Sequence, residues 1–158
     1  MVVVMLALLV SMGCAVVLWA DDRPVAPVSR IEVVLAYHYK GQVSALTEEF
    51  AQAGMPNVHF QFARQGQPPQ NIGVGRAVPA DKAREAIKLA VKYNLGVGIL
   101  LPERLFPPRF VTIASSNFDD TVEYPISKED LAHLLDPSLP TEQFHDLYGQ
   151  LTSVPLKP

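Results

Sequence analysis

Cysteine is almost absent from this sequence of 158 residues, and the only one is Cys14. Because Cys14 stands inside an apolar run, we expect it to act as a small buried hydrophobic side chain. No cysteine follows it, so an intrachain disulfide and a thiolate metal site are excluded for the rest of the chain. Lipidation of Cys14 is also disfavoured, because Ser11 and the bulky Met12 stand where a lipoprotein pattern has leucine and a small residue.

Charge is missing from residues 2–20, which contain no Asp, Glu, Lys or Arg. As a helix this segment would extend ~28 Å at ~1.5 Å per residue, close to the hydrocarbon thickness of a bilayer. The sequence therefore predicts one transmembrane segment, either a signal anchor or a signal peptide. No basic residue precedes the run. If the chain were cleaved after Ala20, Leu18 would stand at the third position before the cut, where signal peptides have a small residue. Both features favour the uncleaved anchor. The missing basic start also leaves open whether Met1 is the true start.

The stretch GVGRAVPADKAREAIKLAVKYN, residues 73–94, lacks the features of a phosphate-binding loop. It has Gly73 and Gly75 but no third glycine, and Pro79 removes a backbone N–H that a phosphate would use. A dinucleotide fingerprint also expects an acidic residue at the end of the next strand, whereas Glu103 stands in a proline-flanked turn. We therefore expect a tight strand-to-helix turn and no nucleotide cofactor.

Five strands are predicted downstream of a short polar linker over residues 21–29, within an α/β domain over 30–116. β-Branched and aromatic residues over 31–39 favour a strand, and 57–63 alternates apolar and polar residues as a half-buried strand does. The remaining three strands are predicted at 71–75, 96–101 and 109–114.

Two helices are expected between these strands. Val43, Leu46 and Phe50 recur at helical spacing ahead of Gly54, which is a natural helix stop, and the second helix follows Pro79. The resulting order, βαββαβ with one extra strand, predicts an α/β fold with the ferredoxin-like split βαβ arrangement. In topology alone, this order is similar to that of the sporulation-related-repeat domains, which bind cell-wall glycan.

A helical extension is predicted over residues 117–158. Ser127 stands three residues before Asp130, which is typical of a capping box at the start of a helix. Phe144 and Tyr148 lie on the apolar stripe of a second helix, because residues four apart share one face. We therefore expect two short amphipathic helices after the sheet.

The charges are unevenly distributed along the chain, although the net formal charge is only −3. Residues 60–110 hold eight Lys or Arg against three Asp or Glu, whereas residues 111–158 hold two against eight. Arg84, Lys88 and Lys92, spaced by four, place three like charges on one helix face. Either the acidic tail packs near this face, or the face meets an anionic surface such as lipid headgroups, a cell-wall polymer or an acidic protein.

No pair among the four histidines has the three- or four-residue helical spacing of metal ligands, so no metal site is predicted. His38 and His59 fall on predicted strands, and a meeting of the two on the open sheet face would create a metal-binding or pH-sensing pair. Ordinary solvent contact is the simpler interpretation. His133 and His145 lie off the apolar stripes of the last two helices and are expected to be solvated.

Ser115, Ser116, Asp119 and Asp120 follow the last predicted strand, at a place where active sites occur. No Gly-x-Ser-x-Gly elbow accompanies them, and an Asx-rich turn explains them without chemistry. The two aspartates offer too few oxygens at alternating positions for a Ca²⁺ loop. We therefore predict no catalytic site, with a small hydrolase that uses Ser115 or Ser116 as the alternative.

The combined prediction is a membrane-anchored binding or assembly module outside the cytoplasm, without catalytic activity or cofactor. Its expected partner is an envelope protein, a cell-wall polymer or an anionic lipid. Nucleic acid is disfavoured, because the aromatic and glycine-rich strands of RNA-recognition domains are missing. A regulatory domain for a small ligand is a second alternative, and the nearly cancelling charges over 21–23 leave the membrane orientation open. The candidate partner-binding residues are Tyr37, Tyr39 and His59 on the sheet, with Arg84, Lys88 and Lys92 on the helix.

Overall fold

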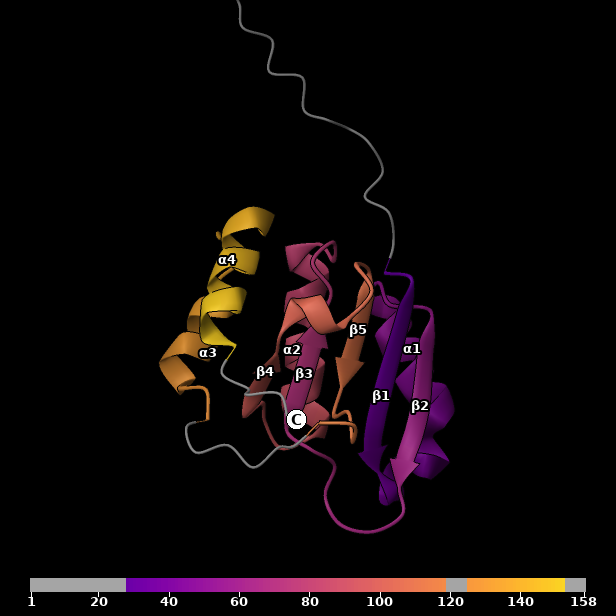
Figure 1. The fold of residues 1–158 in the computed structure, drawn as a ribbon. Coiled ribbons are helices and arrows are strands. Elements are labelled where there is room, and N and C mark those ends of the chain that lie inside the picture. The colour runs from indigo at the N-terminus through magenta and orange to yellow at the C-terminus, as the bar shows by residue number, and fades with distance from the viewer. Residues whose placement is uncertain (1–27, 119–124, 153–158) are drawn as a thin grey trace, which may run out of the picture.

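The computed structural model of the chain describes residues 28–118 and 125–152 (Figure 1). The predicted membrane segment, residues 1–20, and most of the predicted linker lie outside these ranges. Among the helices that are described, none has the length and apolar character needed to cross a bilayer. The membrane anchor therefore stays a prediction from sequence.

Five strands form one mixed sheet in the order β2-β1-β5-β3-β4. β1 pairs in parallel with both β2 and β5, and β3 pairs in parallel with β4. An antiparallel pairing of β5 with β3 joins the two halves. The strands are β1 (Arg30–Ala36), β2 (Val58–Ala63), β3 (Asn71–Val74), β4 (Ile99–Leu101) and β5 (Phe110–Ile113).

The α/β class is confirmed, but the strand order differs from the predicted split βαβ arrangement. In a split unit another strand lies between the two parallel strands. Here β1 pairs directly with β2 across α1 (Val43–Gln52), and β3 pairs directly with β4 across α2 (Ala80–Tyr93). The order of elements along a chain does not record which strands become neighbours, and crossover-linked strands are neighbours in most sheets. The topological similarity to sporulation-related-repeat domains therefore has no support in the described strands.

The helices form a layer on one face of the sheet and a cover at one edge (Figure 1). α1 and α2 lie behind the sheet, where Ile31, Phe50 and Ile87 belong to one buried core. α3 (Lys128–Leu134) and α4 (Thr141–Leu151) lie beside β4. Phe144 and Tyr148 of α4 belong to the same core, so the C-terminal helices pack as part of the α/β unit.

Helix boundaries agree with the sequence patterns. Gly54 ends α1 with φ +80°, a conformation that L side chains rarely adopt. The Ser127 hydroxyl oxygen accepts a 3.0 Å hydrogen bond from the Asp130 backbone N–H, which confirms the predicted cap of α3. Phe144 and Tyr148 are fully buried, which confirms the apolar stripe of α4.

The first predicted strand is too long at its C-terminal end. β1 stops at Ala36, and Tyr37–Gln42 form a 3₁₀ helix, η1. Ala36 is the last residue of β1 that pairs with β2, where it lies opposite Ala63. Without a strand beside it, the chain leaves the sheet despite the strand propensity of its aromatic residues. Tyr37 and Tyr39 therefore lie on η1 and not on the sheet face.

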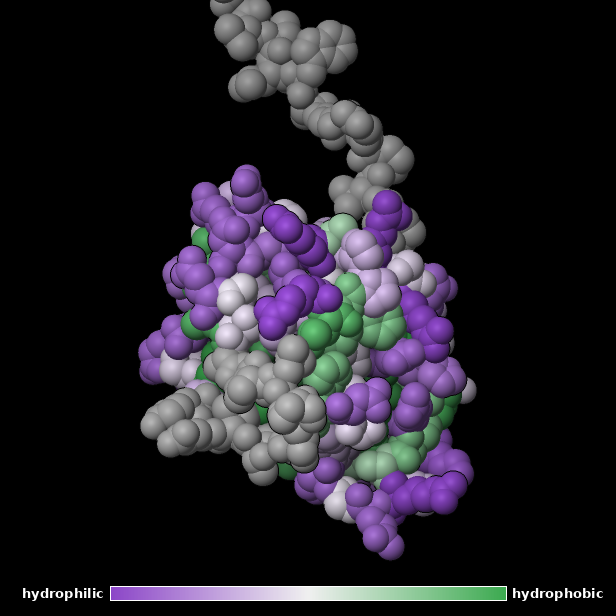
Figure 2. Space-filling view, in the orientation of Figure 1, coloured by the Kyte–Doolittle hydropathy of each residue, from purple (hydrophilic) through white to green (hydrophobic). Residues whose placement is uncertain are grey.

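Gly73 in β3 is needed because the chain crosses closely over the open face of this strand. A Cβ atom at Gly73 would lie 2.3 Å from the Phe106 ring. Phe106 stacks on Phe110 with ring centroids 5.9 Å apart and contacts Phe118 edge-on at 5.8 Å. Figure 2 shows an apolar area at the centre of this face with hydrophilic residues around it.

The turn from β3 into α2 uses its backbone N–H groups within the protein. Gly75 donates to the Phe110 carbonyl at 2.8 Å, and Ala77 donates to the Pro108 carbonyl at 2.7 Å. Val78 closes the turn by donating to the Gly75 carbonyl at 3.0 Å. These donors are not free for a phosphate, which agrees with the prediction of an ordinary strand-to-helix turn.

Candidate functional site

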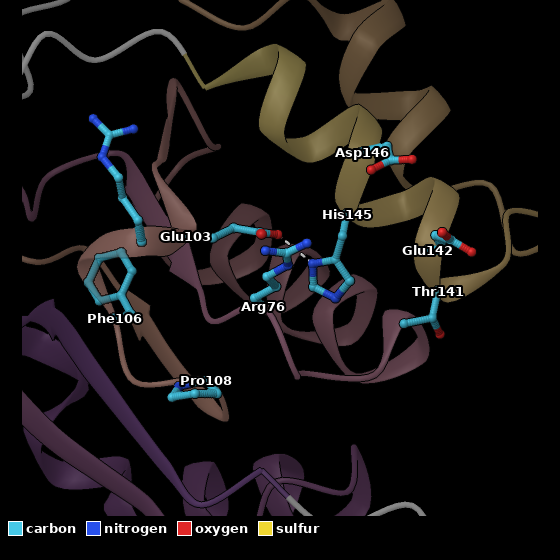
Figure 3. A pocket seen from close by; sticks show the side chains of 9 residues that line it. Arg76, Glu103, Phe106, Pro108, Thr141, Glu142, His145 and Asp146 are labelled. Carbon is cyan, nitrogen blue, oxygen red and sulfur yellow. Dashed lines mark hydrogen bonds and ion pairs between the residues drawn. The ribbon is translucent and has the colours of Figure 1, made fainter.

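An open cleft of about 690 Å³ lies between α4, the 3₁₀ helix η2 (Glu103–Leu105) and the turn that leads into α2 (Figure 3). This volume is within the range of ~300–1,000 Å³ that is typical of small-ligand sites. The residues that line it are Arg76, Glu103, Arg104, Phe106, Pro108, Thr141, Glu142, His145 and Asp146.

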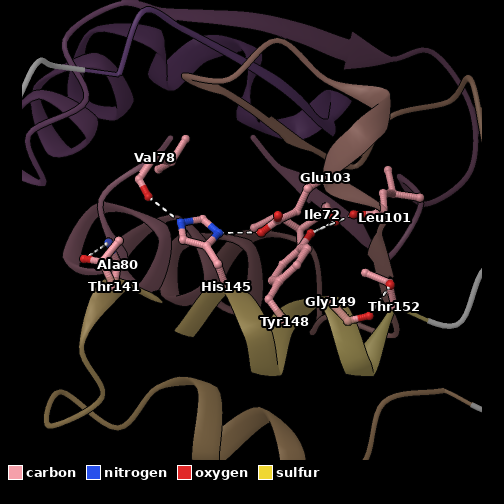
Figure 4. Close-up of polar contacts among 10 residues, drawn as sticks. All are labelled: Ile72, Val78, Ala80, Leu101, Glu103, Thr141, His145, Tyr148, Gly149 and Thr152. Atoms are coloured by element: carbon pink, nitrogen blue, oxygen red, sulfur yellow. Dashed lines mark hydrogen bonds and ion pairs between the residues drawn. The ribbon is translucent and has the colours of Figure 1, made fainter. Parts of the chain in front are cut away.

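His145 on α4 lies in the wall of this cleft and is bonded through both ring nitrogens (Figure 4). Its Nδ1 contacts a carboxylate oxygen of Glu103, and its Nε2 lies 2.8 Å from the Val78 carbonyl oxygen. Both partners are acceptors when Glu103 is ionised, and an imidazolium donates to both at once. The His145 and Glu103 side chains are only 10% and 15% exposed. This contact ties α4 to η2 and to the start of α2.

The prediction that His145 is solvated is wrong. His145 follows the buried Phe144 and precedes the buried Tyr148 by three residues, so it lies at the margin of the apolar stripe. An apolar pattern does not show a polar side chain that is buried through a hydrogen bond to a distant segment. Glu103 was missed as its partner, because 42 residues separate the two in sequence. His133 is exposed, as expected.

Tyr148 fixes the base of α4 against the sheet (Figure 4). Its hydroxyl lies 3.0 Å from the carbonyl oxygens of both Ile72 in β3 and Leu101 in β4. Complete burial raises the pKa of Tyr148, because the phenolate loses its hydration. The hydroxyl thus stays neutral and donates to carbonyl oxygens of β3 and β4, which anchors α4 to both strands.

Basic and acidic side chains both line the cleft, and one of the acidic ones, Glu103, comes from η2 together with Arg104. Arg76 and Arg104 come from the turn after β3 and from η2, whereas Glu142 and Asp146 project from α4. Arg76 points toward Glu103 in Figure 3. Neither arginine forms an ion pair with another residue of 28–118 or 125–152. A guanidinium offers parallel donors that match a carboxylate or phosphate, so the two arginines suit an anionic group.

Ser115, the candidate nucleophile, has a structural role at the end of β5. The Asn71 side chain donates to the Ser115 carbonyl at 2.9 Å and accepts from its N–H at 2.8 Å. These bonds hold Ala114 in the left-handed region at φ +59°. The Ser115 hydroxyl oxygen accepts a long 3.4 Å contact from the Asn117 N–H. No described histidine hydrogen-bonds to this hydroxyl, so Ser115 lacks the adjacent base that activates a serine nucleophile.

Asp119 and Asp120 lie outside the described residues. Within residues 28–118 and 125–152, no group of three or more His, Cys, Asp or Glu side chains converges as metal ligands do. The two histidines that were predicted on strands also lie apart. His59 of β2 lies opposite Glu32 of β1, whereas His38 lies in η1, beyond the end of β1. Four register positions separate Glu32 from Ala36, or ~13 Å at ~3.3 Å per residue.

The basic stripe predicted on α2 is largely used within the fold. Arg84 is only 7% exposed, where it donates to the Leu134 carbonyl at 3.2 Å and lies 5.3 Å from the centre of the Phe144 ring. Lys88 is exposed and pairs with Glu85 at 2.7 Å. Arg84 therefore docks the C-terminal helices and is not available to a partner.

Lys92 links α2 to α1 through a small polar cluster. Its Nζ lies 2.6 Å from a Glu49 carboxylate oxygen, and the Tyr93 hydroxyl donates to the same carboxylate. Burial raises the pKa of the Glu49 carboxyl, but the hydrogen bonds from Lys92 and Tyr93 outweigh it and the net pKa is lowered. The hydrogen bond to Glu49 raises the pKa of Lys92. Lys92 thus also has an internal partner.

The predicted aromatic face is divided between two places. Tyr37 is 55% exposed on η1, with Lys40 5.3 Å from its ring centre. Tyr39 packs edge-on against Tyr93 at 5.3 Å and so belongs to the contact between η1 and α2. His59 is exposed on β2. Tyr37 and Tyr39 therefore lie on η1, and His59 lies on β2.

The residues of the cleft are thus the basis for a functional interpretation. No protein-family model matches the chain, and no curated protein or solved structure shows significant similarity to it.

Proposed function

We propose that the chain is a membrane-anchored binding or assembly module outside the cytoplasm, without catalytic activity of its own, and that the cleft beside His145 recognises its partner. The observation that carries this proposal is the pair Arg76 and Arg104, which line a cleft of ligand size without an ion pair to any other described residue. Such guanidinium groups suit an anionic group on the partner.

The cleft favours binding over catalysis. A general base needs a nitrogen or oxygen that is free to accept a proton from a substrate. Both nitrogens of His145 already face protein oxygens, so its role is to hold the cleft wall. A preorganised wall reduces the entropy lost on binding. Phe106 and Pro108 add apolar contact area beside the two arginines.

The charges of the cleft favour an envelope protein over an anionic lipid or a uniformly anionic polymer. Glu142 and Asp146 of α4 line the cleft together with the two arginines. These carboxylates would repel a uniformly negative surface, whereas a protein segment carries both signs and complements both kinds of charge. The favoured partner is therefore a protein segment with an acidic side chain next to a basic one.

Site-specific photocrosslinking in cells that express the chain tests this function. A photoreactive residue at Thr141 lies in the cleft and leaves both arginines in place, and one at Lys88 lies on the exposed face of α2 as a matched control. We expect one adduct of defined mass from position 141, none from position 88, and loss of the adduct when Arg76→Glu is added. If folded protein gives no adduct from position 141, or keeps it with Arg76→Glu, the proposal is wrong.

The cellular address has its own test, because the anchor is proposed from residues 1–20 alone. A C-terminal epitope tag should be digested by added protease once the outer barrier is opened, before the cells are lysed. Protection until lysis would place the domain in the cytoplasm and contradict the extracytoplasmic part of the proposal.

A free small ligand is the second candidate, because the volume of the cleft, about 690 Å³, fits an amino acid or a small dicarboxylate. A thermal-shift screen with these compounds distinguishes the two. Stabilisation that Arg76→Glu abolishes would favour the regulatory ligand-binding function over the protein partner.

A further inference from the structure

The β2 strand forms an open outer edge of the sheet (Figure 1). It pairs with β1 without interruption from Ile31 opposite Val58 to Ala36 opposite Ala63. No other strand of the described residues pairs with its second side. A row of backbone donors and acceptors is therefore exposed along this edge.

One hydrogen bond fixes which groups of β2 point outward. The Ile31 N–H donates to the Asn57 carbonyl at 3.1 Å. In a parallel ladder, alternate residues bond to the neighbouring strand, so the odd-numbered residues of β2 face β1. The N–H and C=O groups of Val58, Phe60 and Phe62 point away from the sheet.

The sequence of β2 itself lacks the usual features that prevent pairing of an exposed edge. Residues 58–63, VHFQFA, contain no proline and no Asp, Glu, Lys or Arg, and their register with β1 has no bulge. Proteins commonly block an exposed edge with a charge, a proline or a bulge. A strand of six residues without these devices is long enough to template another strand.

We propose that β2 pairs in antiparallel fashion with β2 of a second copy of this chain, centred on Phe60. In this register Phe60 lies opposite Phe60 of the second copy, and Val58 lies opposite Phe62. By symmetry the Val58–Phe62 pair occurs twice, so the register contains three pairs. In each pair the N–H and C=O groups of both residues point outward and form two hydrogen bonds, which gives about six in total. Two five-stranded sheets would thereby become one continuous sheet.

The side chains of β2 match this symmetric register. Val58, Phe60 and Phe62 are half-buried on the face that carries α1, so apolar residues meet apolar residues there. On the other face the exposed His59 lies opposite Gln61, and neither is an Asp, Glu, Lys or Arg. A shift by one residue would put apolar side chains on the polar face. The central pattern Val-His-Phe-Gln-Phe is nearly symmetric, which fits a second copy better than an unrelated strand.

A matched pair of variants of the full chain in detergent micelles tests the pairing by light scattering on size exclusion over a dilution series. Both variants carry His59→Lys, which places a lysine beside Glu32 in the register with β1. Adding Gln61→Lys creates two like-charge pairs per dimer, and adding Gln61→Glu creates two opposite-charge pairs. We expect the wild type to have twice the 17.3 kDa chain mass, and the Gln61→Lys variant to have a dissociation constant at least about tenfold higher than its partner.

Equal dissociation constants for the two variants would overturn the proposal. A monomeric wild type would also overturn it, and β2 would then be open to pairing with a strand of another protein. His59 and Gln61 are exposed, so both variants should keep the wild-type far-UV circular dichroism. The register has a separate test with His59→Cys and Gln61→Cys together in a Cys14→Ser background. We expect a disulfide-linked dimer from this variant and much less from His59→Cys alone, and comparable yields from both would contradict the register.

Discussion

The two edges of the sheet are treated in opposite ways. β4 is three residues long, is followed by Pro102, and is covered by α4, whose Tyr148 hydroxyl bonds the Leu101 carbonyl. β2 is six residues long, uncharged and paired on one side only. Because a covered edge cannot recruit another strand, association is directed to β2. α4 therefore protects one edge of the sheet and also lines the cleft.

Removing the cover of β4 should have the largest effect. Tyr148→Ala deletes a fully buried aromatic side chain that packs near Phe144 and bonds Ile72 and Leu101, so we expect a loss of about 3–5 kcal/mol in the free energy of unfolding. Urea unfolding followed by far-UV circular dichroism measures it. The loosened α4 should also uncover the second edge and produce species larger than a dimer. Tyr37→Ala, at a 55% exposed site, is the control and should change stability by less than about 0.5 kcal/mol. Similar losses of unfolding free energy in Tyr148→Ala and Tyr37→Ala would show that α4 does not stabilise the β4 edge.

A different segment, which carries Phe106 between η2 and β5, covers the open face of β3, and Gly73→Ala tests this contact. The new methyl group would lie 2.3 Å from the Phe106 ring and 2.9 Å from a Thr112 carbon, so Phe106 must move. We expect a loss of about 1–3 kcal/mol by the same urea measurement, as is typical of overpacking. Gly149→Ala on α4 is the control, because nothing lies within 4 Å of its Cβ position, and it should be neutral or stabilising. A neutral Gly73→Ala would show that the segment over β3 is loosely packed.

His145→Gln separates the anchoring of α4 from the packing of its apolar face. A glutamine amide cannot donate to both Glu103 and Val78 in the geometry of the ring, so one buried acceptor loses its partner. The expected loss is about 1–2 kcal/mol, measured by urea unfolding. His133→Gln, at an exposed position, should be nearly neutral. If both substitutions have equal effects, the His145 contacts do not hold α4 to the cleft.

Local patterns in the sequence predicted most of the elements. The alternation over β2, the cap at Ser127 and the stripe through Phe144 and Tyr148 all depend on neighbours within about four residues, and the structure confirms them. Strand order was not predictable in this way, because the pairing of β5 between β1 and β3 joins distant segments.

The candidate site shows the same limit. Arg84, Lys88 and Lys92 share a spacing of four, which predicted three like charges on one helix face, either near the acidic tail or against an anionic surface. Arg84 differs from the other two because the Leu134 and Leu139 carbonyls, about fifty residues away in sequence, accept its hydrogen bonds. The contact of His145 with Glu103 likewise depends on tertiary packing alone. Spacing identifies a face of a helix, but only the fold determines what lies against it.

The smallest expected effect concerns the contact that supports the β2 half, where Glu49 of α1 accepts from Lys92 and Tyr93 of α2. The folded pKa of Glu49 lies below its ordinary value of 4.5, so its ionised form contributes stability above that pH. This contribution is lost as the pH falls through the folded pKa. Glu49→Gln should therefore be less stable than wild type at pH 7, by less than about 1 kcal/mol because solvent screens the cluster, and nearly equal to it at acidic pH.

Thermal unfolding across pH 3–7 measures this convergence, with Glu48→Gln on the same helix as the control. Glu48 is exposed and contacts only Gln52 at 3.3 Å among the described side chains, so its substitution should give a nearly constant difference. Glu49, Lys92 and Tyr93 belong to α1 and α2 and contribute no backbone group to β2, so dimer formation should be unchanged in Glu49→Gln. If Glu49→Gln made the chain monomeric, pairing at β2 would depend on the α1–α2 contact. Helices would then control association at both edges of the sheet.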